Sequence, residues 1–180
     1  MEARGFKIHW RAAIVGGIAC LLIIPLAFLI LPINTLDLDN IAVNPENGDV
    51  AIIREDAVAK HKIVLALYDK DGTKLFQKSI INNGKTSAKI AFCGENVYVY
   101  ASISGEFHGF GRKGETLTSY ELTAEDVSQN DFFEGWKSSF GKETYEACGL
   151  VYTYERPLPF RHKARLTVTD GNETRIIYED

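Results

Sequence analysis

The sequence has few cysteines and histidines, and it lacks the short motifs in which these residues usually do chemistry. Of its 180 residues, 3 are cysteine and 4 are histidine. It contains no CxxC pair, no HxH or HExxH segment and no GxSxG segment. The sequence therefore lacks the signatures of a dithiol redox centre, a zinc hydrolase and a nucleophile-elbow hydrolase. The sequence therefore predicts a non-catalytic protein with no catalytic residues, no metal and no cofactor.

The sequence also has no excess of basic over acidic residues. The formal net charge is -4 at pH 7, with 20 basic and 24 acidic residues. Residues 1–11 hold three basic residues and one acidic residue, so they carry +2, and the rest of the chain carries -6. Nucleic-acid binding depends on clustered Lys and Arg, so we expect no nucleic-acid partner. At 46% hydrophobic residues, the composition is that of a folded chain and not of a disordered one.

The clearest feature present is a hydrophobic run near the N-terminus. Residues 12–33 are 22 consecutive residues without a charged side chain. As a helix, such a run spans roughly 33 Å, enough to cross a bilayer core of about 30 Å. The basic residues 1–11 before it predict a cytoplasmic N-terminal tail and place residues 34–180 outside the cytoplasm. We thus expect a single-pass signal anchor in the cell membrane; a cleaved signal peptide, whose apolar region is usually shorter, is the alternative.

The rest of the chain has the pattern of short β-strands. Its apolar and β-branched runs are separated by Asn-Gly, Asp-Gly and Lys-Gly pairs, which supply the positive φ that tight hairpin turns require. The pattern predicts an antiparallel all-β domain of roughly 8 to 11 strands. The runs are residues 50–53, 63–68, 74–81, 97–103, 116–122, 149–154, 165–169 and 174–178.

The strand pattern repeats along the chain. Residues 42–53, 91–100 and 146–154 align with one another, and this places Cys93-Gly94 and Cys148-Gly149 at equivalent positions. A second hairpin follows each segment. The repeating unit is therefore two hairpins in about 40 to 45 residues, which is the size of one four-stranded propeller blade.

The sequence pattern of the first repeating unit resembles that of a known family. Its pattern Ile-x-Val-x-Pro-x-x-Gly-x-Val-x-Ile, followed by TyrAspLysAspGlyThrLysLeuPhe, is similar to bacterial β-propeller blades of the NHL or YVTN type. The resemblance implies about three blade-like antiparallel units in residues 34–180. A closed propeller has at least about four blades, so three would leave open strand edges for a protein partner or for self-association. A β-sandwich is the alternative fold.

One insertion, residues 123–143, lies outside the repeat. Its first residues, Thr123 to Asp126, are typical of a helix capping box. The spacing that follows would place four aromatic residues on one helix face, which is either a partner-binding patch or a helix laid over the sheets. These partner-binding candidates are Phe132, Phe133, Trp136 and Phe140.

Three further features have ordinary structural interpretations. Cys93 and Cys148 form a possible disulfide, because an oxidising exterior permits one, or they are small buried residues beside turn glycines. Asp69 and Gly72 begin like a calcium loop, but the glycine falls at position 4 and not at position 6, so a hairpin turn is expected. We expect His108 in a solvated loop.

These observations favour a membrane-anchored, non-catalytic extracytoplasmic binding or protein-interaction module. Its partners would be the lipid bilayer, through residues 12–33, and a protein, a glycan or a second copy of the chain. Two alternatives stay open. One is a hydrolase whose site is assembled across loops from His61, His108 or His162 and nearby acids. The other is a degenerate propeller fragment without a ligand.

Overall fold

The structure of the protein is a computed structural model. It describes residues 41–55, 62–81, 88–130, 135–139, 141–156 and 163–179. By its contacts the chain divides into two units, Met1–Asn34 and Thr35–Asp180, and all described residues belong to the second. In the part that the structure describes, no helix is long and apolar enough to cross a membrane. The predicted membrane segment, residues 12–33, lies outside the described residues.

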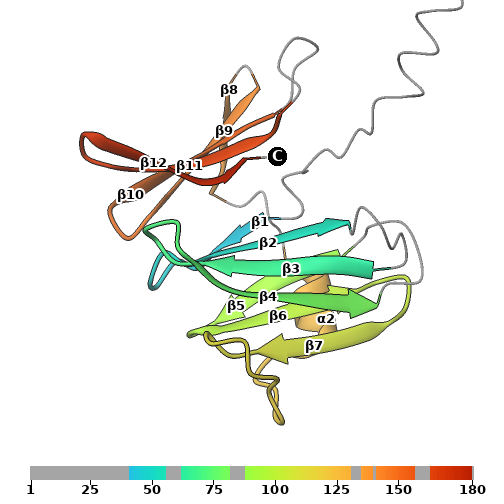
Figure 1. Cartoon of the computed structure of the whole chain (residues 1–180). Helices are drawn as coiled ribbons and strands as arrows, with labels where there is room; N and C mark the ends of the chain where they lie inside the picture. Colours follow the sequence, from blue (N-terminus) through green and yellow to red (C-terminus); the bar gives the residue numbers. More distant parts are fainter. Residues whose placement is uncertain are drawn as a thin grey trace, which may run out of the picture. The chain divides into compact units, whose positions relative to one another are not determined.

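The described residues form an all-β domain of three antiparallel sheets (Figure 1). The first sheet contains β1 (Ile41–Val43), β2 (Val50–Glu55), β3 (Lys62–Tyr68) and β4 (Lys74–Ile81) in chain order. The second contains β5 (Ala88–Cys93), β6 (Asn96–Ala101) and β7 (Glu106–Phe110). The third contains β8 (Lys137–Ser139), β9 (Lys142–Ala147), β10 (Leu150–Glu155), β11 (Arg165–Asp170) and β12 (Glu173–Glu179). Each sheet is an up-and-down meander, so short hairpin turns connect most neighbouring strands.

Strands β2 and β3 of the first sheet are buried on both faces. Alternate residues of β2 and β3 point to opposite sides, as in any strand. Val50, Ile52 and Ala66 share one hydrophobic cluster with Tyr152 and Leu166 of the third sheet. The other alternate residues share a second cluster with the second sheet; they are Ala51, Ile53, Leu65 and Leu67. Burial on both faces explains why β2 and β3 are continuous hydrophobic runs in the sequence.

The second sheet has its outer face covered by the chain that follows it. Helix α2 (Ala124–Gln129) packs on this face through Val127, which is fully buried together with Tyr98. Thr123 is the N-cap of this helix. Its hydroxyl accepts a hydrogen bond from the Asp126 amide, and the Asp126 carboxylate accepts one from the Thr123 amide. The predicted capping box is therefore confirmed.

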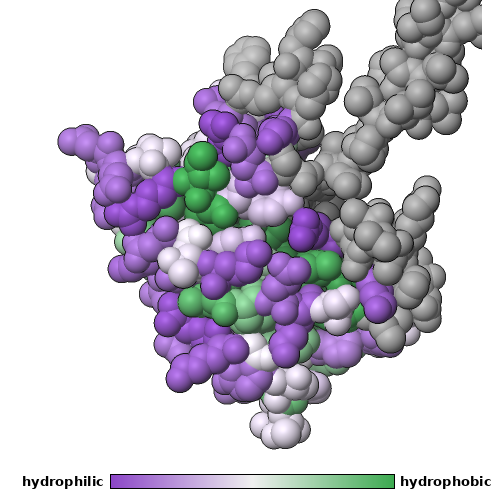
Figure 2. Space-filling view, in the orientation of Figure 1, coloured by the Kyte–Doolittle hydropathy of each residue, from purple (hydrophilic) through white to green (hydrophobic). Residues whose placement is uncertain are grey.

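The third sheet has an outer face exposed to solvent. Along β10, Tyr152 and Tyr154 point inward and are buried, whereas Val151, which precedes them, is 38% exposed. On β12, Ile176 is 52% exposed. The alternation of buried and exposed residues is that of a strand with one face in a core and one in water. In the view of Figure 2, hydrophobic residues of the described part appear in small groups among hydrophilic ones.

The all-β prediction is confirmed, and most predicted strands coincide with observed ones apart from their ends. The described residues form three sheets, whereas a β-sandwich would have two. The sheets have four, three and five strands, so only the first has the four strands predicted for each repeating unit. The strand predicted at residues 116–122 is wrong, because only Thr116 pairs, in a single bridge with Phe110. Beyond that bridge the chain folds over the second sheet, where the Tyr120 ring packs edge-on against Phe107 at 5.1 Å.

The insertion at residues 123–143 also differs from the prediction. The helix ends at Gln129 with Asn130 as its C-cap, so Trp136 does not lie on a helix face. Gly135 has a φ of +84°, a left-handed conformation that a helix does not allow. Strand β8 lies within the insertion, which is thus partly β. The other aromatic candidates, Phe132, Phe133 and Phe140, lie outside the described residues.

Candidate binding site at the hairpin turns

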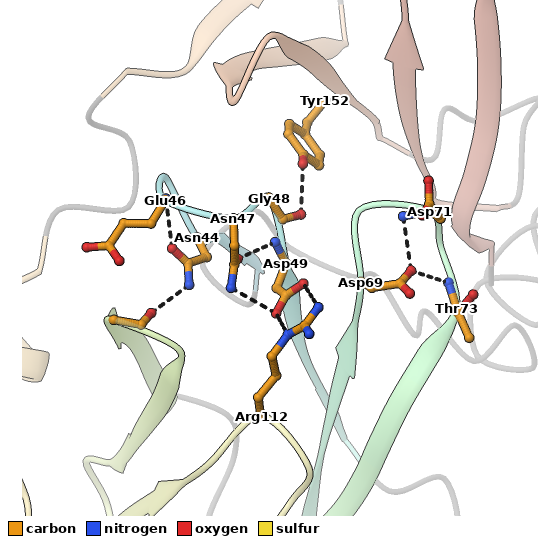
Figure 3. Close-up of polar contacts among 11 residues, drawn as sticks. Asn44, Glu46, Asn47, Gly48, Asp49, Asp69, Asp71, Thr73, Arg112 and Tyr152 are labelled. Carbon is orange, nitrogen blue, oxygen red and sulfur yellow. Dashed lines mark hydrogen bonds and ion pairs between the residues drawn. The ribbon is translucent and has the colours of Figure 1, made fainter.

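The turn between β1 and β2 is held by its own polar groups. The Asn44 side-chain oxygen accepts a hydrogen bond from the Glu46 amide at 2.9 Å, and the Asn47 side-chain oxygen accepts one from the Asp49 amide at 2.9 Å (Figure 3). The Gly48 amide donates to the Asn44 carbonyl at 3.0 Å. Asn, Asp and Gly form such turns because short amide and carboxylate side chains bond to nearby backbone, and glycine permits positive φ. The result is a rigid turn.

This turn is bonded to the second sheet. The Asn44 side-chain amide donates to the Gly94 carbonyl at 2.7 Å, in the equivalent turn of the next unit. Arg112, just after β7, donates to both carboxylate oxygens of Asp49, from Nε at 2.6 Å and from Nη2 at 3.0 Å. Asp49 is 1% exposed, so its charge is neutralised by one bidentate guanidinium. The hydrogen bonds from Arg112 to Asp49, and then the Asp49 charge, raise the pKa of Arg112 above its ordinary value.

The same turn is bonded to the third sheet. The buried Tyr152 hydroxyl donates to the Gly48 carbonyl at 2.8 Å. The Cys148 thiol donates to the Pro45 carbonyl at 3.2 Å. Burial raises the pKa of Tyr152 well above its ordinary value. The β1–β2 turn therefore connects all three sheets.

A groove of about 620 Å³ opens beside this turn. Four hairpin turns contribute to its lining, two from the first sheet and two from the third. Its volume lies within the range of about 300–1,000 Å³ typical of small-ligand sites. The lining residues are Glu46, Asn47, Lys70, Asp71, Cys148, Gly149, Leu150, Val168, Asp170, Glu173 and Arg175.

The groove is charged on its rim and apolar in part. The Arg175 guanidinium forms ion pairs with Asp71 and with Glu173, the latter at 2.9 Å, and so connects the first and third sheets. Its hydrogen bond to Glu173 is the main cause of the raised pKa of Arg175, and the same contact lowers the pKa of Glu173. Exposed Lys70 adds a positive charge, and Leu150 supplies apolar surface. Such a lining suits a polar partner that carries charge.

The hairpin turn predicted from Asp69 to Gly72 is confirmed. The Asp69 carboxylate accepts from the amides of Asp71 at 3.0 Å and Thr73 at 2.8 Å, and Gly72 has a φ of +83°. The carboxylate is therefore occupied by the turn's own backbone. Among the described residues, no group of three or more His, Cys, Asp or Glu is placed to hold a metal ion.

Cys93 and Cys148 do not form a disulfide. Cys93 lies beside the Glu121 carboxylate at 3.1 Å, whereas Cys148 contacts Pro45. The alternative prediction, that both cysteines are small buried residues beside turn glycines, is also wrong, because Cys148 is exposed and Cys93 is partly exposed. The hydrogen bond to Glu121 is the main cause of the raised pKa of the Cys93 thiol.

His108 lies on strand β7 and not in the loop that we expected. Its Nε2 is 3.1 Å from the Glu106 carboxylate, and its side chain is 33% exposed. Neither residue lines the turn groove or the second groove described below. His61 and His162 lie outside the described residues.

Trp136 lines a second groove, of about 430 Å³, with Ile41, Phe92 and Tyr145. Its ring stacks on Tyr145 with a centroid distance of 5.3 Å, and it packs against the core between the first and third sheets. Trp136 thus has a structural role in this position. A partner contact through the four aromatic candidates stays a prediction.

The sequence did not predict the residues that build the site at the β1–β2 turn. Asn44, Asp49 and Tyr152 lie within the repeated segments, so the repeat was the signal available for them. Arg112 lies outside them, and no local pattern pairs it with a carboxylate 63 residues earlier. No protein-family model matches the chain, and no curated protein is significantly similar to it.

Proposed function

We propose that the protein is a single-pass membrane protein that displays its β domain outside the cytoplasm as a non-catalytic binding module. The membrane placement rests on the uncharged residues 12–33 and the basic residues before them. On the same proposal, the three sheets are blade-like units related to β-propellers, because each sheet follows one repeat of the sequence.

The observation that carries the binding function is the groove formed by four hairpin turns from two sheets. Turn sites held by a rigid scaffold are favourable for recognition because loops vary while the framework stays fixed. Here the framework is the β1–β2 turn, whose Asp49 and Gly48 are bonded to Arg112 and Tyr152. None of the described groove residues is a histidine, and the Cys148 thiol bonds to a backbone carbonyl. The described lining therefore offers no histidine–carboxylate pair for the hydrolase that the sequence left open.

Photocrosslinking in living cells tests the proposal. A photoreactive amino acid at Lys70, which lines the groove, is expected to give one discrete crosslinked product on illumination. Lys78, which is also solvent-exposed but lies on β4 outside the groove lining, is the matched control. The same products from both positions, or no product from Lys70, would contradict binding at the groove.

A further inference from the structure

The exposed face of the third sheet has an ordered distribution of charge. Three rows of outward side chains cross β9 to β12, as the strand register defines. The first row consists only of charged residues with alternating signs. Lys142 pairs with Glu155 at 2.6 Å, and Arg165 pairs with Glu179 at 2.7 Å. Across the four strands the order is therefore plus, minus, plus, minus.

Over these four strands the other two rows carry one charge, that of Glu146, which pairs with Lys137 of the neighbouring strand β8 at 3.1 Å. Apart from Glu146, every member is β-branched and thus presents a stiff, flat surface. The second row is Thr144, Thr153, Thr167 and Ile176, and the third is Glu146, Val151, Thr169 and Thr174. The hydroxyls are partly satisfied within the sheet, since Thr169 and Thr174 bond to each other at 3.0 Å and Thr167 bonds to the Thr153 carbonyl at 3.4 Å. An uncharged centre beside a charged margin is typical of protein interfaces.

We propose that this face binds the same face of a second copy of the chain. The argument is charge complementarity. A two-fold axis parallel to the strands, between β10 and β11, places β9 of one copy over β12 of the other and β10 over β11. Lys142 then faces Glu179 of the second copy, and Glu155 faces Arg165. No like charges meet, and Thr153 faces Thr167 at the centre.

This arrangement agrees with known sheet packing. Rotation about such an axis keeps the strands of the two sheets aligned, which is a preferred geometry for stacked sheets about 10 Å apart. Four strands about 4.8 Å apart and six residues of about 3.3 Å each give a patch of roughly 20 by 20 Å per copy. So small an interface predicts a reversible dimer, and anchoring in one membrane would raise the effective concentration.

The strand edges are less suitable for self-association. Edge strand β4 carries exposed Lys74 and Lys78, and β12 has a register shift against β11. Lysines and bulges on edge strands discourage pairing with another chain. Self-association is therefore expected through the face of the third sheet and not through the edges at β4 and β12.

The first test is the mass of the full chain in detergent by sedimentation equilibrium over a dilution series. We expect a reversible monomer–dimer equilibrium, and Ile176→Lys should weaken it at least about tenfold, because a charge then enters the uncharged second row, where Ile176 faces Thr144 of the second copy. Ile103→Lys is the matched control, since Ile103 is 53% exposed, close to the 52% of Ile176, but lies in the β6–β7 turn. A chain that stays monomeric, or a dimer that Ile176→Lys leaves unchanged, would overturn the proposal.

A charge exchange provides the second test. Glu155→Lys alone should weaken the dimer about tenfold, because lysine then faces Arg165 of the second copy. Inverting the whole row (Lys142→Glu, Glu155→Lys, Arg165→Glu and Glu179→Lys) keeps both pairs within the sheet and restores opposite charges across the two-fold axis, so the dimer should return to within about threefold of the original. If the chain with the inverted row is as weak a dimer as the single variant, the face is not the interface. This test is independent of the groove, so it can fail while the binding function holds.

Discussion

Replacing Arg112 with alanine is expected to lower the free energy of unfolding by about 2–3 kcal/mol. The change leaves the Asp49 carboxylate, which is 1% exposed, without the guanidinium that donates to both of its oxygens. Breaking a buried ion pair from one side costs about 3–5 kcal/mol. The Arg112 side chain is 40% exposed, so solvent screens part of the interaction. We therefore expect a loss of about 2–3 kcal/mol, at or below the lower end of that range.

Urea denaturation of the full chain in a mild detergent, followed by near-ultraviolet circular dichroism of the buried tyrosines, measures this change. Lys113→Ala is the matched control, because Lys113 is the neighbouring residue and is exposed; it should cost less than about 0.5 kcal/mol. In an Asp49→Asn background the Arg112→Ala effect should shrink to about 1 kcal/mol, since no buried charge remains to be compensated. If Arg112→Ala costs no more than Lys113→Ala, the role of this ion pair in joining the sheets is refuted.

Four further predictions concern the stability of the β domain. Tyr152→Phe should cost about 1–2 kcal/mol in a urea titration, because the buried Gly48 carbonyl loses its donor. The raised pKa of Tyr152 means that the unfolded chain ionises first, so thermal stability should fall above about pH 10, and less steeply in Tyr152→Phe. Gly48→Ala should destabilise more than Gly171→Ala by the same titration: both glycines have positive φ, but a Cβ at Gly48 would lie 2.6 Å from the Tyr152 hydroxyl, whereas Gly171 has open space. Thr123→Ala should cost about 0.5–2 kcal/mol through loss of the helix cap, and equal stability would contradict the capping box.

The strands were predictable where residue pattern and burial agree. Runs such as residues 63–68 are apolar throughout because β3 is buried on both faces, and the turn at Gly72 has the local chemistry of a hairpin. The prediction failed at residues 116–122, whose alternating pattern is that of a strand. There the packing of Tyr120 on the second sheet prevails over local propensity.

The candidate site was predictable only in part. The repeat indicated that turns such as that at Gly48 are equivalent, but not that they meet around one groove, because the stacking of sheets is set by contacts distant in sequence. The Tyr152 hydroxyl reaches a carbonyl 104 residues earlier in the chain. Likewise the spacing of Trp136 suggested a helix face, whereas the helix ends at Gln129 and the ring stacks on Tyr145.

The most direct test of the account is whether the β domain lies outside the cytoplasm. A membrane-impermeant maleimide, applied to intact cells that express the full chain, should label the exposed thiol of Cys148. Cys93 should react more slowly, because its hydrogen bond to Glu121 raises its pKa and lowers its thiolate fraction. We expect labelling of intact cells that Cys148→Ser removes for the most part. Labelling that appears only after the membrane is permeabilised would contradict the proposed membrane-anchored binding module.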